Sequence, residues 1–292
     1  MARSASCTIN ELPPLAQLCV LRVRTVDDLT SLLTQGTNLR WLQVQEAEGS
    51  FSRDVQHGHA AAWSSKLEIL NIGACQQLGE EECSHLLQLI GKMVAPQLRW
   101  LQLRGWPCAE LPHTLFQAPR WPALLHLAFT ASSSLEQLPH ELGNLVNIIR
   151  LDLSGCSELK ELPDSTTNLQ RLKVLNLNCC IGLRLLPNSL GKLQCLEALK
   201  LAGCSSLQAL PDSIAQLQLL RTVDLSYCSE LCSLPAGFEH LPLQTFLYKY
   251  LNAYVPSEWL SKWDSSGKCC IDLCFLHMPH AASGQACCCG AT

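Results

Sequence analysis

Charged and aromatic residues are scarce in this chain, at 16% and 6% of its 292 positions. Disordered chains are rich in charge and poor in large apolar residues, so this composition favours a folded protein. Acidic residues exceed basic ones, 25 against 21, which does not favour nucleic acid as a partner. No stretch of 18 apolar residues occurs, so we expect no membrane span.

The sequence also lacks the motifs of common catalytic and nucleotide-binding sites. It contains no G-x-x-x-x-G-K-[ST] loop, no H-E-x-x-H or C-x-x-C pair and no G-x-S-x-G turn. Its His, Ser and Asp residues are scattered and do not assemble into a triad by spacing. We therefore expect a protein that is not an enzyme and that holds no cofactor or metal.

The cellular location is inferred from further absences. The first 14 residues carry no uninterrupted apolar run of a secretory signal, and no Asn-x-Ser/Thr glycosylation site occurs. The 18 cysteines are interpreted as reduced thiols of a cytoplasmic protein. The alternative is the disulfide framework of a secreted domain.

Leucine is abundant, with 58 residues, and it recurs periodically. In the second half of the chain the unit reads L-x-x-L-x-L-x-x-C-x-x-L-x-x-L-P-x-x-[ILF]-x-x-L, and both its Cys and its Leu-Pro pair repeat every 24 residues. The four cysteines are Cys156, Cys180, Cys204 and Cys228. Less regular units extend upstream to Leu18, which makes nine units in total.

This unit resembles the leucine-rich repeat family. The stretch L-D-L-S-G-C-S-x-L-x-x-L-P, from Leu151 to Pro163, is similar to the repeats of plant intracellular disease-resistance receptors of the TIR and nucleotide-binding type. The resemblance covers residues 18–241. It implies an α/β fold, a curved leucine-rich-repeat solenoid or horseshoe, with a parallel β-sheet on the concave face and short helices or turns on the convex face.

The same resemblance implies a function in protein–protein interaction and defence-type signal transduction. The nucleotide-binding switch of such receptors has no counterpart in this sequence, so no nucleotide role is carried over. Whether the chain is a free-standing repeat protein or part of a receptor stays open. The alternative function is a scaffold or substrate-recognition subunit of a larger signalling or ubiquitin-ligase complex, although no F-box-like segment fits in the 17 residues before the first repeat.

Three regions are expected along the chain. Residues 1–17 form an N-terminal cap, residues 18–242 form the repeat domain with regular units from residue 124, and residues 243–292 hold a C-terminal cap and a Cys-rich tail. Aromatic residues are expected to cover the last coil, namely Tyr250, Tyr254, Trp259 and Trp263. For the tail, three interpretations remain open: an unstructured end, S-acylation, or metal binding by Cys269, Cys270, Cys274, Cys287, Cys288 and Cys289 with His277 and His280.

Alternation along each short strand separates inward from outward side chains. Positions four and six of the unit point inward, whereas positions three, five and seven line the concave face. Trp and Arg are enriched in binding hot spots, so the outward columns are the candidate partner site. The residues are Trp41, Trp100, Arg22, Arg24, Arg104, Gln43, Gln102, Arg150, Asp152, Asn176, Lys200 and Asp224. The alternative for the two tryptophans is packing against a lateral neighbour or cover by the N-terminal segment.

The remaining positions of the unit have structural roles. The family usually has an inward Asn or Cys at the ninth position, so the resemblance implies that Cys156, Cys180, Cys204 and Cys228 form a column of small buried thiols. A metal site would need closely paired ligands, which this column lacks. After each Leu-Pro pair, Asp164, Asn188 and Asp212 are expected to cap one helical turn. The long unit that begins at Leu67 is expected to hold a true convex helix.

Overall fold

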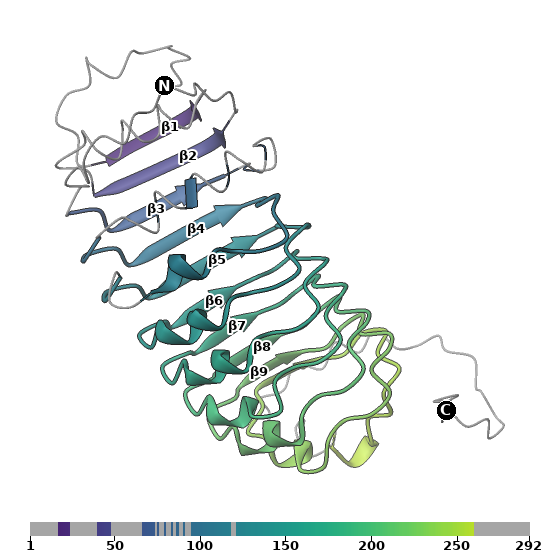
Figure 1. Cartoon of the computed structure of the whole chain (residues 1–292). Coiled ribbons are helices and arrows are strands. Elements are labelled where there is room, and N and C mark those ends of the chain that lie inside the picture. The colour runs from purple at the N-terminus through teal and green to yellow at the C-terminus, as the bar shows by residue number, and fades with distance from the viewer. Residues whose placement is uncertain are drawn as a thin grey trace, which may run out of the picture.

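The computed structural model describes residues 17–23, 40–47, 66–73, 95–117 and 121–259, with single positions at 75, 79, 83, 86, 87 and 90. Its strands form one ten-stranded parallel sheet in which sequence order and spatial order coincide (Figure 1). The strands are β1 (Gln17–Val23), β2 (Trp41–Ala47), β3 (Ile69–Ile72), β4 (Trp100–Arg104), β5 (His126–Thr130), β6 (Arg150–Asp152), β7 (Val174–Asn176), β8 (Ala198–Lys200), β9 (Thr222–Asp224) and β10 (Thr245–Leu247).

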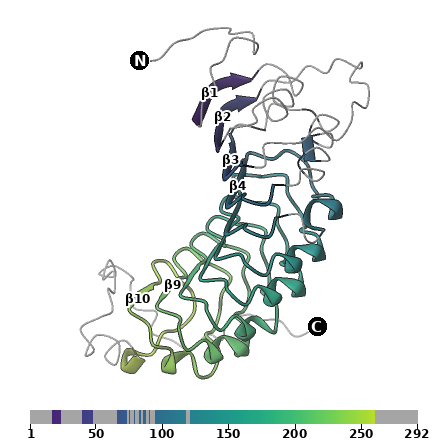
Figure 2. The ribbon, with the colours of Figure 1, turned by 90° about the vertical axis from the view of Figure 1, so that its left-hand side faces the viewer.

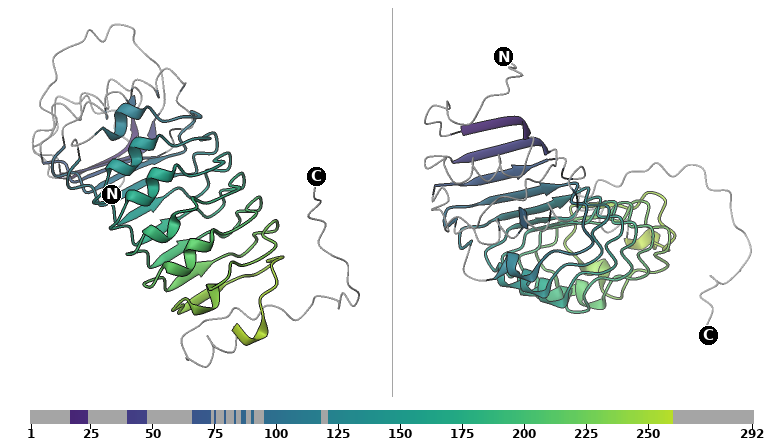
Figure 3. Two further views of the ribbon diagram at one scale, coloured as in Figure 1. Left: turned by 60° about the horizontal axis from the view of Figure 1, so that its bottom comes forward. Right: turned by 45° about the horizontal axis from the view of Figure 1, so that its top comes forward.

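The chain is a curved solenoid, as the repeat predicts. The sheet lines the inner side of the curve and short 3₁₀ helices follow one another along the outer side (Figures 2 and 3). These helices are η3 (His113–Phe116), η4 (His140–Asn144), η5 (Asp164–Asn168), η6 (Leu190–Lys192), η7 (Asp212–Gln216) and η8 (Phe238–His240). In the described part of the chain, no helix is long and apolar enough to cross a membrane.

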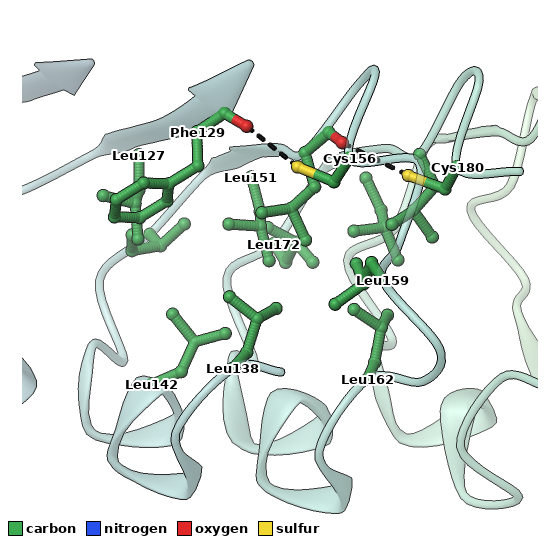
Figure 4. Close-up of a cluster of buried hydrophobic side chains, with 14 of the residues drawn as sticks. Leu127, Phe129, Leu138, Leu142, Leu151, Cys156, Leu159, Leu162, Leu172 and Cys180 are labelled. Atoms are coloured by element: carbon green, nitrogen blue, oxygen red, sulfur yellow. Dashed lines mark hydrogen bonds between the residues drawn. The ribbon is translucent and has the colours of Figure 1, made fainter. Parts of the chain in front are cut away.

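Rows of apolar side chains fill the solenoid. From β2 onward, parallel pairing puts the fourth position of each unit level with that of the next unit. This row runs through Leu42, Leu70, Leu101, Leu127, Leu151, Leu175, Leu199, Val223 and Phe246, and none of these exposes more than 1% of its surface. Figure 4 shows how leucines from the strands and from the convex side meet in one continuous core.

The turn after each of the strands β4 to β10 has a left-handed backbone at the eighth position. Here φ lies between 54° and 79°, at Gly105, Ala131, Gly155, Cys179, Gly203, Tyr227 and Tyr250. This conformation points the amide of Gly155 at the carbonyl of Asn178 in the next unit, 2.8 Å away, and the other units repeat the bond. A Cβ atom on Gly155 would lie 3.1 Å from the Cα atom of Ala131, so glycine also suits the close approach there.

The convex helices differ from the sequence prediction in their capping. Pro163 and Pro211 are the N-cap residues of η5 and η7, and no side chain caps either helix. Asp164 and Asp212 are instead the first residues within these helices, and η6 is preceded by Ser189 rather than Asn188. The predicted caps are therefore wrong. At η5 and η7 the extended Pro takes the N-cap place and the Asp becomes the first helical residue, and η6 begins two residues after Asn188.

The long unit that begins at Leu67 agrees with the sequence prediction at its described positions. Cys83, Leu86, Leu87 and Ile90 have α-helical backbone and are buried in the core. Their spacing of three, one and three residues keeps them on one face of the helix.

The C-terminal end adds one more strand, β10, beyond residue 242. Trp259 stacks on Phe238, with ring centroids 6.4 Å apart, and packs against the core as a cap does. Tyr250 and Tyr254 do not cover the last coil, because 55% and 79% of their surfaces remain exposed. Trp263 and the cysteines of the tail lie outside the described residues, as does the expected N-terminal cap through residue 16.

Replacing Leu175 with Asp is expected to lower the free energy of unfolding by about 3–5 kcal/mol, since the carboxylate would be buried without a partner. Leu175 is fully buried. The same change at Leu219, which is 44% exposed, is the matched control and is expected to cost little. Thermal melting of both variants tests the assignment, and equal melting temperatures for Leu175→Asp and the unaltered chain would refute it.

Candidate partner-binding surface

A row of large side chains crosses the concave face at the third position of the first units. Backbone pairing puts Trp41 level with Ile69, Trp100, His126 and Arg150 on successive strands. Trp41 and Trp100 expose 40% and 36% of their surfaces. Trp100 also packs against His126, with ring centroids 4.7 Å apart and planes tilted by 34°. Trp100 therefore both packs against a lateral neighbour and remains exposed. The aromatic surface of the row is accessible to a partner.

His126 is held neutral within this row. Burial lowers the pKa of His126, and the nearby positive charge of Arg150 lowers it further. Its Nδ1 atom is buried and has no hydrogen-bond partner among the described residues. At neutral pH the imidazole therefore packs against the indole ring of Trp100 as an uncharged aromatic side chain.

The predicted residues of the fifth position form a second row, level with one another from strand to strand. Gln43, Gln102, Asp152, Asn176, Lys200 and Asp224 are all partly exposed and lie in register. Ala128 belongs to the same row but is buried, because its methyl group lies below its larger neighbours.

Several of these side chains already serve the fold. Asp152 Oδ1 accepts hydrogen bonds from the amide and the hydroxyl of Ser154, at 2.9 and 2.7 Å. Asn176 and Asp224 accept from the amides two residues further on in the same way. Asn176 also donates to Asp152 Oδ2, at 3.0 Å. The acidic and amide residues of the regular units therefore hold the strand ends, a role that the sequence pattern did not reveal.

The arginines of the predicted site fall into two groups. Arg104 and Arg150 are exposed on the concave face, as expected. Arg22 was expected beside Gln43, but the backbone pairs Arg22 with Glu46 and Cys19 with Gln43, so the predicted register of the first strand is wrong by three residues. The stretch Q-L-C-V-L-R-V has apolar residues on both faces of the strand, so the alternation of apolar and polar residues cannot fix its register. Arg24 lies outside the described residues.

The cysteine column joins each unit to the unit before it. Each thiol donates to a carbonyl of the preceding unit, from Cys156 to Phe129 at 3.0 Å and from Cys180 to Leu153 at 3.2 Å (Figure 4). Cys204 and Cys228 repeat the bond. Burial raises the pKa of Cys156 and Cys228 to about 12. Burial likewise raises the pKa of the Cys180 and Cys204 thiols.

Two departures from the cysteine pattern have structural equivalents. Ser132 replaces Cys in its unit, is fully buried, and accepts a hydrogen bond from the amide of Trp106 at 3.0 Å. Trp106, at the same position one unit earlier, is buried as well. Among the described residues, no three His, Cys, Asp or Glu side chains are grouped as a metal site requires.

An exposed aromatic pair lies near the other end of the solenoid, where the sequence pattern predicted no site. The rings of Tyr227 and Tyr250 lie 5.1 Å apart, and Lys249 Nζ lies 5.6 Å from the Tyr250 ring centroid. Both tyrosines occupy the left-handed eighth position, which is unfavourable for a bulky residue. The signal in the sequence was their shared position in the repeat, where glycine stands in other units.

A groove on the convex side forms a further hollow. Its volume is about 490 Å³, and Cys108, Glu110, His113, His140 and Glu141 are among its lining residues. Glu141 and His140 interact with each other at 3.3 Å. The groove lies away from the candidate concave rows and brings together no predicted site residue.

Comparison with known proteins supports the fold. No protein-family model matches the chain, and no curated protein matches it. Among solved structures, the leucine-rich repeat domain of the type III effector XopL is 21% identical with a TM-score of 0.50, over 82% of this chain and 69% of that chain. A chain of the glycosylated Toll–Spatzle complex of Drosophila is 20% identical with a TM-score of 0.56.

The match to the Toll–Spatzle complex covers 79% of this chain but 30% of that chain, so this chain spans less than a third of its length. At these identities the similarity concerns the fold. Together with the parallel sheet and its register, it establishes that this chain folds as a curved leucine-rich-repeat solenoid.

The thiols of the cysteine column are expected to resist alkylation in the folded protein at pH 8. With a pKa of about 12, Cys156 and Cys228 carry almost no reactive thiolate there. Among the described cysteines, exposed Cys179 and Cys232 are expected to react first with iodoacetamide, as peptide mass spectrometry would detect. Denatured protein, in which all cysteines react, is the control, and rapid labelling of Cys156 in the folded chain would contradict the burial.

Replacing Arg150 with Gln is expected to raise the pKa of His126 towards its usual value, because a repelling positive charge is removed. The rise will be partial, since burial is the larger cause of the lowering. A pH titration followed by NMR of the imidazole measures it. Arg184→Gln, a change at an exposed arginine off the concave rows, is the control, and an unchanged pKa in Arg150→Gln would contradict the proximity.

Proposed function

We propose that this chain is a non-enzymatic protein-interaction module that binds a protein partner on its concave face. The observation that carries this proposal is the row of Trp41, Ile69, Trp100 and His126 on four adjacent strands, in which both tryptophans are exposed and the other two side chains are half-buried. Large aromatic side chains on a solvated face cost solubility, and they are the residues that dominate binding energy once a partner covers them.

The dimensions of the sheet suit such a role. Ten strands at a spacing of about 4.8 Å give a face roughly 45 Å long. Repeat solenoids use extended concave surfaces of this kind for partners. The rows also combine an aromatic centre with polar amides and arginines around it, the arrangement of an interface core and rim.

The biological setting is proposed from resemblance. The unit from Leu151 to Pro163 is similar to repeats of plant intracellular disease-resistance receptors, and this supports a role in defence-type signal transduction. Among the structural neighbours, Toll is in complex with Spatzle, described as a hub in development and innate immunity. The column thiols of Cys156, Cys180, Cys204 and Cys228 are reduced and donate hydrogen bonds, a state that fits the reducing cytoplasm.

A pair of double variants tests the proposal. Trp41→Ala with Trp100→Ala is expected to weaken capture of partner proteins by the tagged full chain about 30-fold or more, since hot-spot residues contribute about 2 kcal/mol or more. Capture is read by quantitative mass spectrometry, and circular dichroism checks that the variant stays folded. Leu185→Ala with Leu219→Ala removes two exposed leucines elsewhere and is the control. Equal capture by both double variants and the unaltered chain would refute the concave site.

A further inference from the structure

The strands β4, β5 and β6 form a distinct part of the concave face, which we call the Ala128 patch. Ala128 lies at its centre, Trp100 and His126 lie along one side, and Arg104 and Arg150 lie at opposite corners. Because Ala128 is small and 7% exposed, the centre of the patch is lower than its rim. The patch has a small buried residue at its centre, an aromatic side and two cationic corners.

The two arginines of the patch have no carboxylate of their own. Both are exposed, and neither guanidinium group makes a hydrogen bond or an ion pair within the described part of the chain. Arg150 instead lies close to His126, whose pKa it lowers. The two arginines thus bring two positive charges to this part of the face, and Asp152, level with Ala128 on β6, offsets them only in part.

Three other cations of the described chain are paired with carboxylates of an adjacent unit. Arg40 meets Glu68, Lys160 meets Glu136 and Lys173 meets Glu197, with nitrogen–oxygen distances of 2.5 to 2.7 Å. Each of these pairs joins adjacent units at corresponding positions. Ion pairs between corresponding positions of adjacent units therefore compensate charge in this repeat. Arg104 and Arg150 take part in no such pair among the described residues.

The carboxylate nearest in sequence to Arg150 is already occupied. Asp152 Oδ1 accepts two hydrogen bonds from Ser154, and Asp152 Oδ2 accepts one from Asn176. These bonds tie Asp152 to its own strand end and to β7. A partner that brings carboxylates of its own would meet two arginines ready to bind them, with little competition from within the chain.

We propose that the Ala128 patch binds an acidic, extended segment of the protein partner, with carboxylates at Arg104 and Arg150 and an apolar residue against Trp100. This inference rests on the proposed function and adds the chemistry of the partner. Guanidinium groups bind carboxylates through paired, charge-assisted hydrogen bonds. Charge complementarity therefore favours a peptide rich in Asp and Glu over a neutral or basic one.

The dimensions define the length of the segment. From sheet geometry, the Cα atoms of Arg104 and Arg150 lie roughly 16 Å apart across the patch. An extended peptide spans that distance with about five residues. Two acidic residues separated by three or four positions, with an apolar residue between them, match the two corners and the aromatic side.

Peptide selection tests the inference directly. A phage library of random dodecapeptides is selected on the full chain, and the affinity of synthetic hits is measured by fluorescence anisotropy. We expect hits that carry at least two acidic residues and an apolar one, and weaker binding at high salt. Arg104→Gln with Arg150→Gln is expected to lower their affinity about 100-fold, roughly tenfold for each arginine–carboxylate pair that is removed.

The control removes the same charge elsewhere. Arg171→Gln with Arg184→Gln also takes away two exposed arginines, and it is expected to leave the affinity unchanged within about twofold. Equal reductions in both double variants would indicate a general charge effect and overturn the inference. Thermal melting of each double variant confirms that the solenoid stays folded.

The outcomes separate the two proposals. Neutral or basic hits whose binding depends on Trp41 and Trp100 but not on the two arginines would overturn the acidic segment and leave the concave site standing. Hits that no concave substitution affects would overturn both. Acidic hits that lose binding to the double variant Arg104→Gln with Arg150→Gln, but not to the control double variant, would support both.

Discussion

Everything in this fold depends on the contact between one unit and the next. A single unit has a strand of three to seven residues and a half-covered row of leucines, and neither is stable in water by itself. The neighbouring unit supplies both missing parts, since it covers the leucines and accepts the amides of the strand and of the turn that follows. Cysteine thiols add a further bond at the same boundary. Stability is therefore built up boundary by boundary.

This constraint decides which residues remain for binding. The fourth, sixth and ninth positions are used in stacking, and the eighth must accept a left-handed backbone. The fifth position is only partly available in the regular units, because Asp152, Asn176 and Asp224 accept hydrogen bonds from amides at their own strand ends. What is left is the third position and part of the seventh. The tryptophans and the unpaired arginines lie at these two places.

The sequence predicted the fold well because stacking leaves a periodic record. Leucine spacing indicated the repeat and its inward rows, and the resemblance to the leucine-rich repeat family implied the parallel sheet and the buried cysteines. The prediction failed where periodicity says nothing. The stretch around Arg22 is apolar at both parities, so its register depends on pairing with β2. The bonds of Asp152 depend on Ser154 and Asn176, and the exposure of Tyr250 depends on how the last coil ends. The partner, which belongs to another molecule, leaves no periodic trace.

The regular half of the solenoid has one more consequence, for the way such a protein evolves. From Cys156 to Cys228 each boundary reuses the same sulfur-to-carbonyl and amide-to-carbonyl bonds, at nearly the same lengths. Unequal crossing-over in the gene could add or remove one whole 24-residue unit. The new neighbours would then form the same boundary, with the same hydrogen bonds. The concave face can thus be lengthened or shortened by one unit at a time, while point substitutions on that face change which partner it binds.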